Sequence, residues 1–145
     1  MTKRPRGKVT AIHPADENHR VLTVEGASGA YMRQPCPECP WRRDAPIGAF
    51  PAEAFRISAG TAYDAAVSQF ACHMAGVEAG ATCAGFLLRN SRNNIGTRLA
   101  ALAGRLDPSK VSSPVPLFRS YREMAEANGV APDDPALARC RADDD

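Results

Sequence analysis

The stretch from Cys36 to Arg43 reads Cys-Pro-Glu-Cys-Pro-Trp-Arg-Arg, and it predicts the centre around which the chain folds. A Cys-x2-Cys pair closes a tight turn that points two thiolates toward one point. Two further cysteines, Cys72 and Cys83, follow downstream and would complete a shell of four sulfurs. We therefore expect one metal ion or small cluster held by Cys36, Cys39, Cys72 and Cys83.

The metal itself stays open between zinc and a 4Fe-4S cluster. A structural zinc site is the commoner use of four dispersed cysteines in a small domain, which favours zinc. Zinc knuckles often have a glycine after the second cysteine, whereas this chain has Pro40, which lacks an amide hydrogen. Cys-Pro steps also occur in ferredoxin-type motifs, which keeps the cluster open. His73 follows Cys72 directly and is the alternative ligand if Cys72 points away.

Composition and length bound the class of protein. The 145 residues suit one domain, and 44% apolar with 23% charged residues is ordinary for a soluble globular chain. No apolar run approaches the roughly 20 residues that span a bilayer, and the basic start lacks the apolar stretch of a secretion signal. We expect a cytoplasmic protein without a membrane partner. Its thiols are then reduced, which favours metal ligation over disulfides.

The predicted organisation is a basic arm over residues 1–8, one metal-centred domain over 9–128 and an acidic flexible tail over 129–145. Two strand-like runs within 9–24 predict an N-terminal β-hairpin, and residues 34–51 are proline-rich and predict a metal loop without regular structure. The expected fold class is a small, metal-stabilised α+β domain.

Helices are expected in four places. One begins near Pro51 and ends at Gly60, and a second is capped by Thr61 and runs to Phe70. A long helix covers 83–106, and a short one covers 117–128 and ends at Gly129. The long helix carries one apolar stripe, which we expect to face the core. Its members are Leu88, Ile95, Leu99, Leu102 and Leu106.

Trp41, Arg42 and Arg43 follow the second cysteine and have two interpretations. They suit a positively charged aromatic surface that stacks on bases or grips phosphate. We favour the alternative, in which Trp41 packs over the metal site and an arginine pairs with Asp44. The fifth cysteine, Cys140, is expected to be a spare exposed thiol.

Charge is unevenly distributed along the chain. The net charge of +2 is the sum of +4 over residues 1–10, −3 over 11–83, +6 over 84–122 and −5 over 123–145. Such a pattern suits a nucleic-acid or acidic-partner surface, or neutralisation within the molecule, which we favour.

Four motif blocks carry a resemblance to a family. They are Cys36-Pro37-Glu38-Cys39-Pro40-Trp41-Arg42, Gly48-Ala49-Phe50-Pro51, Phe70-Ala71-Cys72-His73 and Cys83-Ala84-Gly85-Phe86-Leu87. Over roughly residues 34–105 the chain resembles small uncharacterised phage and prophage proteins. The resemblance implies a phage-linked origin and a shared cysteine centre, but no activity.

The expected function depends on whether the predicted metal site keeps an open coordination position. Four thiolate ligands leave no position for water or substrate, so an enzyme is the minority interpretation. We expect an interaction module in the host-cell cytoplasm that binds a host or phage protein through surfaces fixed by the metal. The alternatives are a nucleic-acid-binding regulator and an iron–sulfur protein with a redox or enzymatic role.

Overall fold

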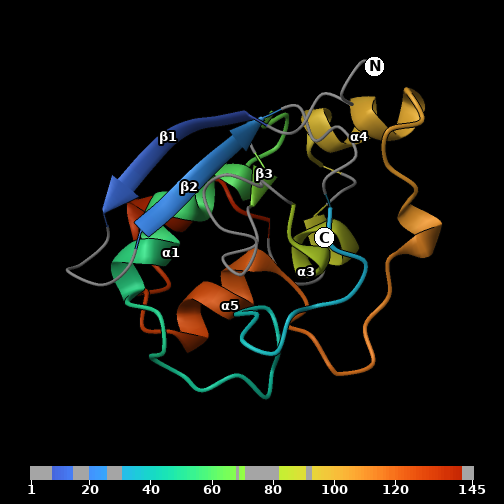
Figure 1. The fold of residues 1–145 in the computed structure, drawn as a ribbon. Coiled ribbons are helices and arrows are strands. Elements are labelled where there is room, and N and C mark those ends of the chain that lie inside the picture. Colours follow the sequence, from blue (N-terminus) through green and yellow to red (C-terminus); the bar gives the residue numbers. More distant parts are fainter. Residues whose placement is uncertain are drawn as a thin grey trace.

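The computed structural model describes residues 8–14, 20–25, 31–67, 69–70, 82–90 and 93–141. A three-stranded sheet in the order β1-β2-β3 lies along one side of the molecule (Figure 1). Strands β1 (Lys8–Pro14) and β2 (Arg20–Glu25) pair antiparallel, as the sequence predicts here, with an irregularity between Val9 and Ala11. The short strand β3 (Gln69–Phe70) adds antiparallel to the other side of β2. The basic arm, up to residue 7, lies outside the described residues.

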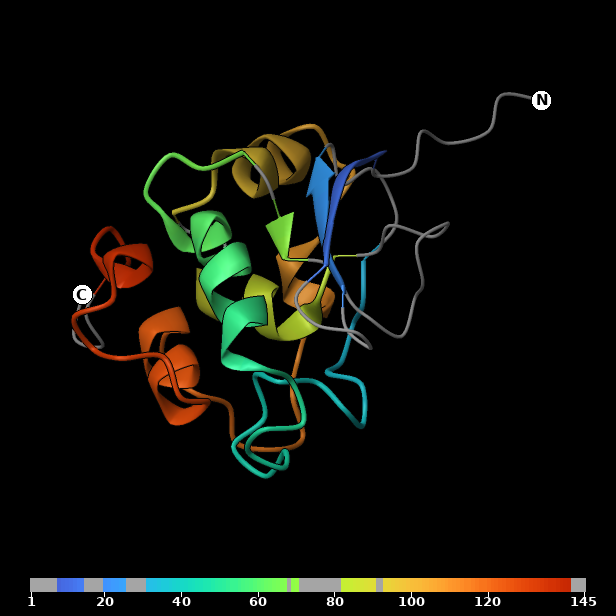
Figure 2. The ribbon, with the colours of Figure 1, turned by 90° about the vertical axis from the view of Figure 1, so that its left-hand side faces the viewer.

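Short helices gather on one side of this sheet, which Figure 2 shows nearly edge-on. The α-helices are α1 (Ala52–Ser58), α3 (Ala84–Asn90), α4 (Ile95–Leu102) and α5 (Tyr121–Ala127). The 3-10 helices are η1 (Ala59–Ala62), η3 (Pro108–Lys110) and η4 (Pro135–Leu137). The arrangement contains both strands and helices, while stabilisation of the fold by a metal stays a prediction.

The segment after Pro51 forms a helix where the sequence predicts one, but it ends differently. Helix α1 continues directly into η1, which runs through Gly60 instead of stopping there. The predicted second helix, residues 61–70, is wrong. Its backbone makes long-range pairs instead, because Ala66 bridges to Asn94 and residues 69–70 join the sheet as β3.

The predicted long helix over 83–106 is also wrong, because the chain breaks it into α3 and α4. Asn94 begins α4, since its side-chain oxygen accepts the Thr97 amide at 2.9 Å. Gly104, with φ of +75°, follows its last turn, and the Arg105 amide returns to the Ala100 carbonyl at 2.9 Å. This is a Schellman-type ending, which makes glycine the natural residue there.

The apolar stripe of that segment does not face the core as a whole. Leu106 is buried, but Ile95, Leu99 and Leu102 are 37%, 55% and 84% exposed. Helix α4 instead buries Thr97 on its inner side. The expectation of one core-facing stripe is therefore wrong for α4.

The C-terminal region is more structured than the sequence predicts. Helix α5 starts later than expected, at Tyr121, because the Ser120 side chain accepts the Glu123 amide at 3.0 Å. In place of a loose acidic tail from residue 129, the chain packs back on the domain and buries Val130 and Leu137. Residues 142–145 lie outside the described part.

The core joins the proline-rich loop of residues 34–51 to the helices. Its largest fully buried side chains come from the loop, α1, α3, α5 and the C-terminal segment. They include Trp41, Phe55, Phe86, Tyr121, Met124 and Leu137. The Tyr121 hydroxyl donates to the Phe55 carbonyl at 2.5 Å, so this buried phenol keeps a partner. Within the described ranges, no helix is long and apolar enough to cross a bilayer.

Candidate metal centre

The loop that carries Cys36 and Cys39 is held by its own backbone. The Cys39 amide donates to the Cys36 carbonyl at 3.0 Å, and the Arg42 amide donates to the Cys39 carbonyl at 3.1 Å. These two successive turns leave Cys36 8% and Cys39 1% exposed. Both thiols therefore face the interior from one tight loop.

Cys83 reaches the same place from a different part of the chain. Its amide donates to the Phe70 carbonyl at 2.9 Å, and its own carbonyl accepts the Leu87 amide at 3.1 Å. The first bond ties Cys83 to strand β3, and the second begins helix α3. Cys83 is thus positioned at a junction between the sheet and a helix, and it is 3% exposed.

The structure brings thiols from both segments into contact. The Sγ atoms of Cys39 and Cys83 lie 3.6 Å apart. A disulfide needs about 2.05 Å, so these are free thiols. Two thiolates on one tetrahedral zinc, at bonds of about 2.3 Å, lie roughly 3.8 Å apart. The observed separation is close to that second value.

Burial and the neighbouring thiols set the pKa of Cys39. A hydrogen bond with Cys36 lowers the pKa of the Cys39 thiol, while the hydrogen bond with Cys83, burial and the charge of Cys83 raise it, with a net value of about 12. The Cys39 thiol therefore interacts with both Cys36 and Cys83. A metal cation would favour the thiolate form instead, since the thiolate is the ligand.

The complete predicted ligand set is not within the described residues. Cys72 and the alternative ligand His73 lie in the undescribed stretch between residues 70 and 82. Among the residues that are described, no group of three or more His, Cys, Asp or Glu side chains is arranged to hold a metal. The structure thus places the Cys39 and Cys83 sulfurs in contact, with Cys36 in the same loop as Cys39. The full set of metal ligands stays a prediction.

Cys140 does not match the expectation of a spare exposed thiol. It is 6% exposed, and its Sγ lies 3.8 Å from the Ala59 carbonyl and 4.0 Å from the Ala136 carbonyl. Burial raises its pKa to about 11. In the described structure, the Cys140 side chain packs the C-terminal segment against Ala59.

Trp41 is fully buried and cannot serve as an exposed stacking platform. Its ring makes edge contacts with Phe70 and Tyr121, at centroid distances of 6.0 and 5.9 Å. Gly85 makes room for it, because a Cβ there would lie 2.5 Å from the Trp41 Cβ. Trp41 therefore packs the loop of residues 34–51 against α3. Its Nε1 atom is buried and has no hydrogen-bond partner among the described residues.

Arg42 supports the loop from outside. Its guanidinium makes two bonds to the Asp44 carboxylate, at 2.7 and 2.8 Å, and reaches the Cys36 carbonyl at 3.4 Å. The bond from Arg42 also lowers the pKa of the Asp44 carboxyl. The predicted pairing of an arginine with Asp44 is confirmed.

Arg43 fastens the loop to the segment before α5. Its amide donates to the Pro116 carbonyl and its Nε to the Leu117 carbonyl, both at 3.0 Å. The guanidinium also bonds to Glu123 and lies 5.2 Å from the centre of the Phe118 ring. Arg43 stays exposed, and its partners lie about 75 residues away in the sequence, so no local pattern indicated them.

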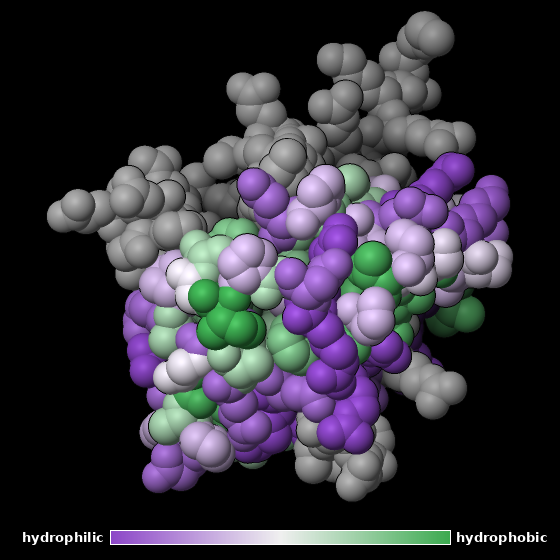
Figure 3. Space-filling view, turned by 90° about the horizontal axis from the view of Figure 1, so that it is seen from below, coloured by the Kyte–Doolittle hydropathy of each residue, from purple (hydrophilic) through white to green (hydrophobic). Residues whose placement is uncertain are grey.

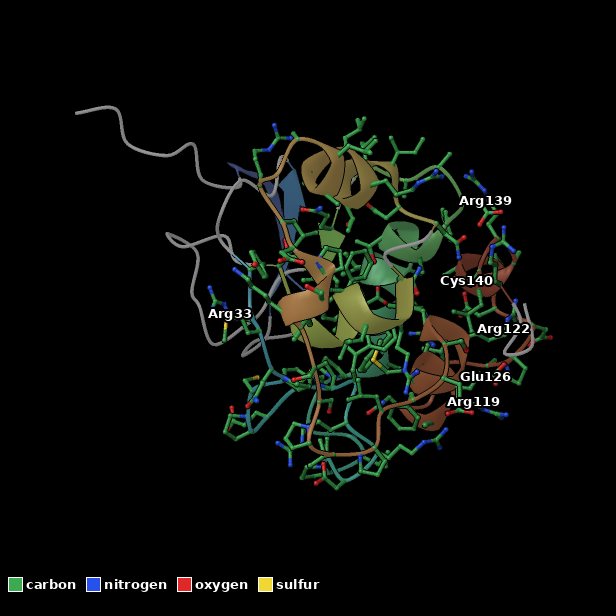
Figure 4. The ribbon with its side chains drawn as sticks, turned by 90° about the vertical axis from the view of Figure 1, so that its right-hand side faces the viewer. Arg33, Arg119, Arg122, Glu126, Arg139 and Cys140 are labelled. Atoms are coloured by element: carbon green, nitrogen blue, oxygen red, sulfur yellow. The ribbon has the colours of Figure 1, made fainter. Side chains whose placement is uncertain are left out.

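Acidic residues of the C-terminal region neutralise arginines within the molecule. Glu123 pairs with Arg43 and Arg119, and Glu126 pairs with Arg122. Figure 4 shows Arg119, Arg122 and Glu126 grouped at α5, with Arg33 on the opposite side of the molecule. Figure 3 shows hydrophilic side chains and small apolar spots intermixed on the face seen from below. Neutralisation within the chain, which the charge pattern favours, is confirmed for these residues.

Comparison with known proteins assigns a family to this arrangement. Residues 31–141 match a family described as a family of unknown function, DUF6283. The chain belongs to this family. The matched range contains all five cysteines and extends well into the packed C-terminal segment. The searches of curated proteins and of solved structures each found no match.

Proposed function

We propose that this protein is a small interaction domain whose surfaces are fixed by one structural zinc ion on Cys36, Cys39, Cys72 and Cys83. The observation that carries the proposal is the 3.6 Å contact between the Cys39 and Cys83 sulfurs, because it brings ligands from two distant segments to one point. The donor set is suitable, since four thiolates are a usual structural zinc shell.

The sulfur separation also favours a single ion over a 4Fe-4S cluster. Two thiolates on one tetrahedral ion lie close together, whereas the four cysteines of a four-iron cluster are spread over its different irons. When bound, zinc would supply folding free energy and no open coordination position. The chain's own residues would support the surrounding surface: the buried Trp41 side chain keeps water from the loop, and Arg42 and Arg43 hold the loop in place.

Binding of a partner protein is favoured over binding of nucleic acid for the Trp41 to Arg43 segment. A stacking platform needs an exposed ring and free cations, while Trp41 is buried and both arginines have internal partners. We keep a phage-linked origin as part of the proposal, on the motif resemblance alone, and with it a host or phage protein as partner.

Elemental analysis of anaerobically purified protein tests the metal. We expect one zinc per chain, lost in Cys36→Ser and Cys83→Ser and retained in Cys140→Ser, the matched control for a buried cysteine. Cys72→Ser compared with His73→Ala identifies the fourth ligand. Chelation should unfold the protein, since structural zinc supplies on the order of 10 kcal/mol. Folded protein without zinc or iron would overturn the proposal, and a brown, iron-loaded protein would replace zinc with a cluster.

A further inference from the structure

Helix α4 buries its small side and exposes its large apolar side. Thr97 and Ala100 are buried, while Ile95, Leu99 and Leu102 have the exposures given above. The exposed three are spaced i, i+4 and i+7, so they share one face of the helix. This is the reverse of the usual arrangement of an amphipathic helix at a protein surface.

The helix is held in this orientation by buried polar contacts. Thr97 Oγ1 accepts a hydrogen bond from Gln69 Nε2 at 3.0 Å and lies 3.1 Å from Asn94 Oδ1. Gly96 packs so closely on the Val67 carbonyl that a Cβ there would lie 2.4 Å from the oxygen. Turning the apolar face inward would break these bonds and leave buried polar groups unpaired. The outward orientation is therefore built into the fold.

Val67 extends the exposed apolar surface beyond the helix. Its side chain is 49% exposed, and its backbone contacts the first turn of α4. We call the surface made by Val67, Ile95, Leu99 and Leu102 the α4 face. Figure 4 shows α4 at the edge of the molecule, with side chains projecting away from the body. Clustered exposed apolar residues of this kind mark interaction sites.

The charge beside the α4 face indicates what covers it. Arg98 lies within the helix, Arg105 follows its end, and both are exposed. Within the described ranges neither has an ion-pair partner, unlike Arg43, Arg56 and Arg122, which pair with acidic residues. Helix α4 itself contains no acidic residue. A complementary surface would combine apolar residues with negative charge.

We propose that the α4 face docks an acidic amphipathic helix of a partner protein. The proposal rests on the proposed function only in that the domain acts by binding a protein. A helix in this role places an apolar stripe on Leu99 and Leu102 and its carboxylates near Arg98 and Arg105. A second copy of the chain is a poorer occupant, because it would bring further arginines toward these two.

Fluorescence anisotropy with two synthetic helical peptides tests the proposal. Both carry the same leucine stripe, and one has Glu and the other Lys at the flanking positions. We expect the Glu peptide to bind at least tenfold more tightly, with an affinity that falls as salt rises. Leu99→Ser with Leu102→Ser should weaken that binding at least tenfold, while Ile47→Ser, an equally exposed apolar site elsewhere, should not.

A charge-reversal variant is the most discriminating test in this binding experiment. Arg98→Glu with Arg105→Glu should reverse the preference, so that the Lys peptide binds more tightly. Equal binding of both peptides, or none up to millimolar concentration, would overturn the proposal. Three other outcomes would also overturn it: binding to vesicles of anionic lipid instead of peptide, binding to duplex DNA instead of peptide, or self-association lost in the leucine variant. Metal content measured on the same samples separates this result from the zinc proposal, and circular dichroism checks folding.

Discussion

Gly85→Ala tests the junction between the loop of residues 34–51 and helix α3. An added Cβ would lie 2.5, 2.6 and 2.9 Å from the Cβ, Cγ and Cδ1 atoms of Trp41. Two of these atoms are close to the Trp41 backbone, and the ring is held by Phe70 and Tyr121, so the side chain cannot swing aside. Something in the backbone must move.

Two opposing effects determine how much Gly85→Ala changes the free energy of unfolding. Replacing glycine by alanine in a helix gains up to about 1 kcal/mol, and less near the first turn, where Gly85 lies. Overpacking a filled core costs about 1–3 kcal/mol, and this site is at the upper end because the contacted atoms are fixed. We expect a net loss of about 2 kcal/mol in the free energy of unfolding. For a chain of this size, that is a fall of roughly 6 °C in Tm.

Thermal and urea unfolding of the purified protein measure the loss. Gly60→Ala is the matched control, because a Cβ there meets only Tyr63 Cε2, at an ordinary 3.9 Å. It should change stability by less than about 0.5 kcal/mol. If Gly85→Ala were as stable as the control, the close packing of Trp41 on α3 would be refuted.

Two further predictions concern Arg43 and Cys140. Arg43→Ala should lower the free energy of unfolding by about 1–2 kcal/mol, because it removes the bonds to Leu117 and Glu123 and the contact with Phe118. Arg98→Ala, which loses no described ion pair, is the control. Equal urea midpoints of the two variants would contradict the prediction. For Cys140, burial raises the pKa from 9.0 to about 11, so the neutral thiol contributes stability that is fully present below pH 9 and is lost as pH rises through 11. Wild type should therefore lose stability relative to Cys140→Ser over this range in pH-dependent unfolding, and parallel curves would show that the thiol titrates normally.

Local signals in the sequence determined the elements that depend on a few neighbouring residues. The strand-like runs of the hairpin pair as expected, and α5 ends just before Gly129, where the glycine predicts an end. The Cys-x2-Cys pair likewise forms a tight loop, because its hydrogen bonds connect residues three apart. The chain alone also predicted that Cys83 joins this pair, although not through which backbone contacts.

Tertiary structure decided which face of each element is buried. The spacing of Ile95, Leu99 and Leu102 predicts one helical face, but periodicity does not say whether that face meets the core or water. Thr97 determines that this apolar face is exposed, because its buried hydroxyl on the opposite side binds Gln69, which lies 28 residues away. Trp41 is buried for the same kind of reason: a glycine 44 residues later leaves space for its ring. Such contacts are set by packing between distant segments, and no local pattern encodes them.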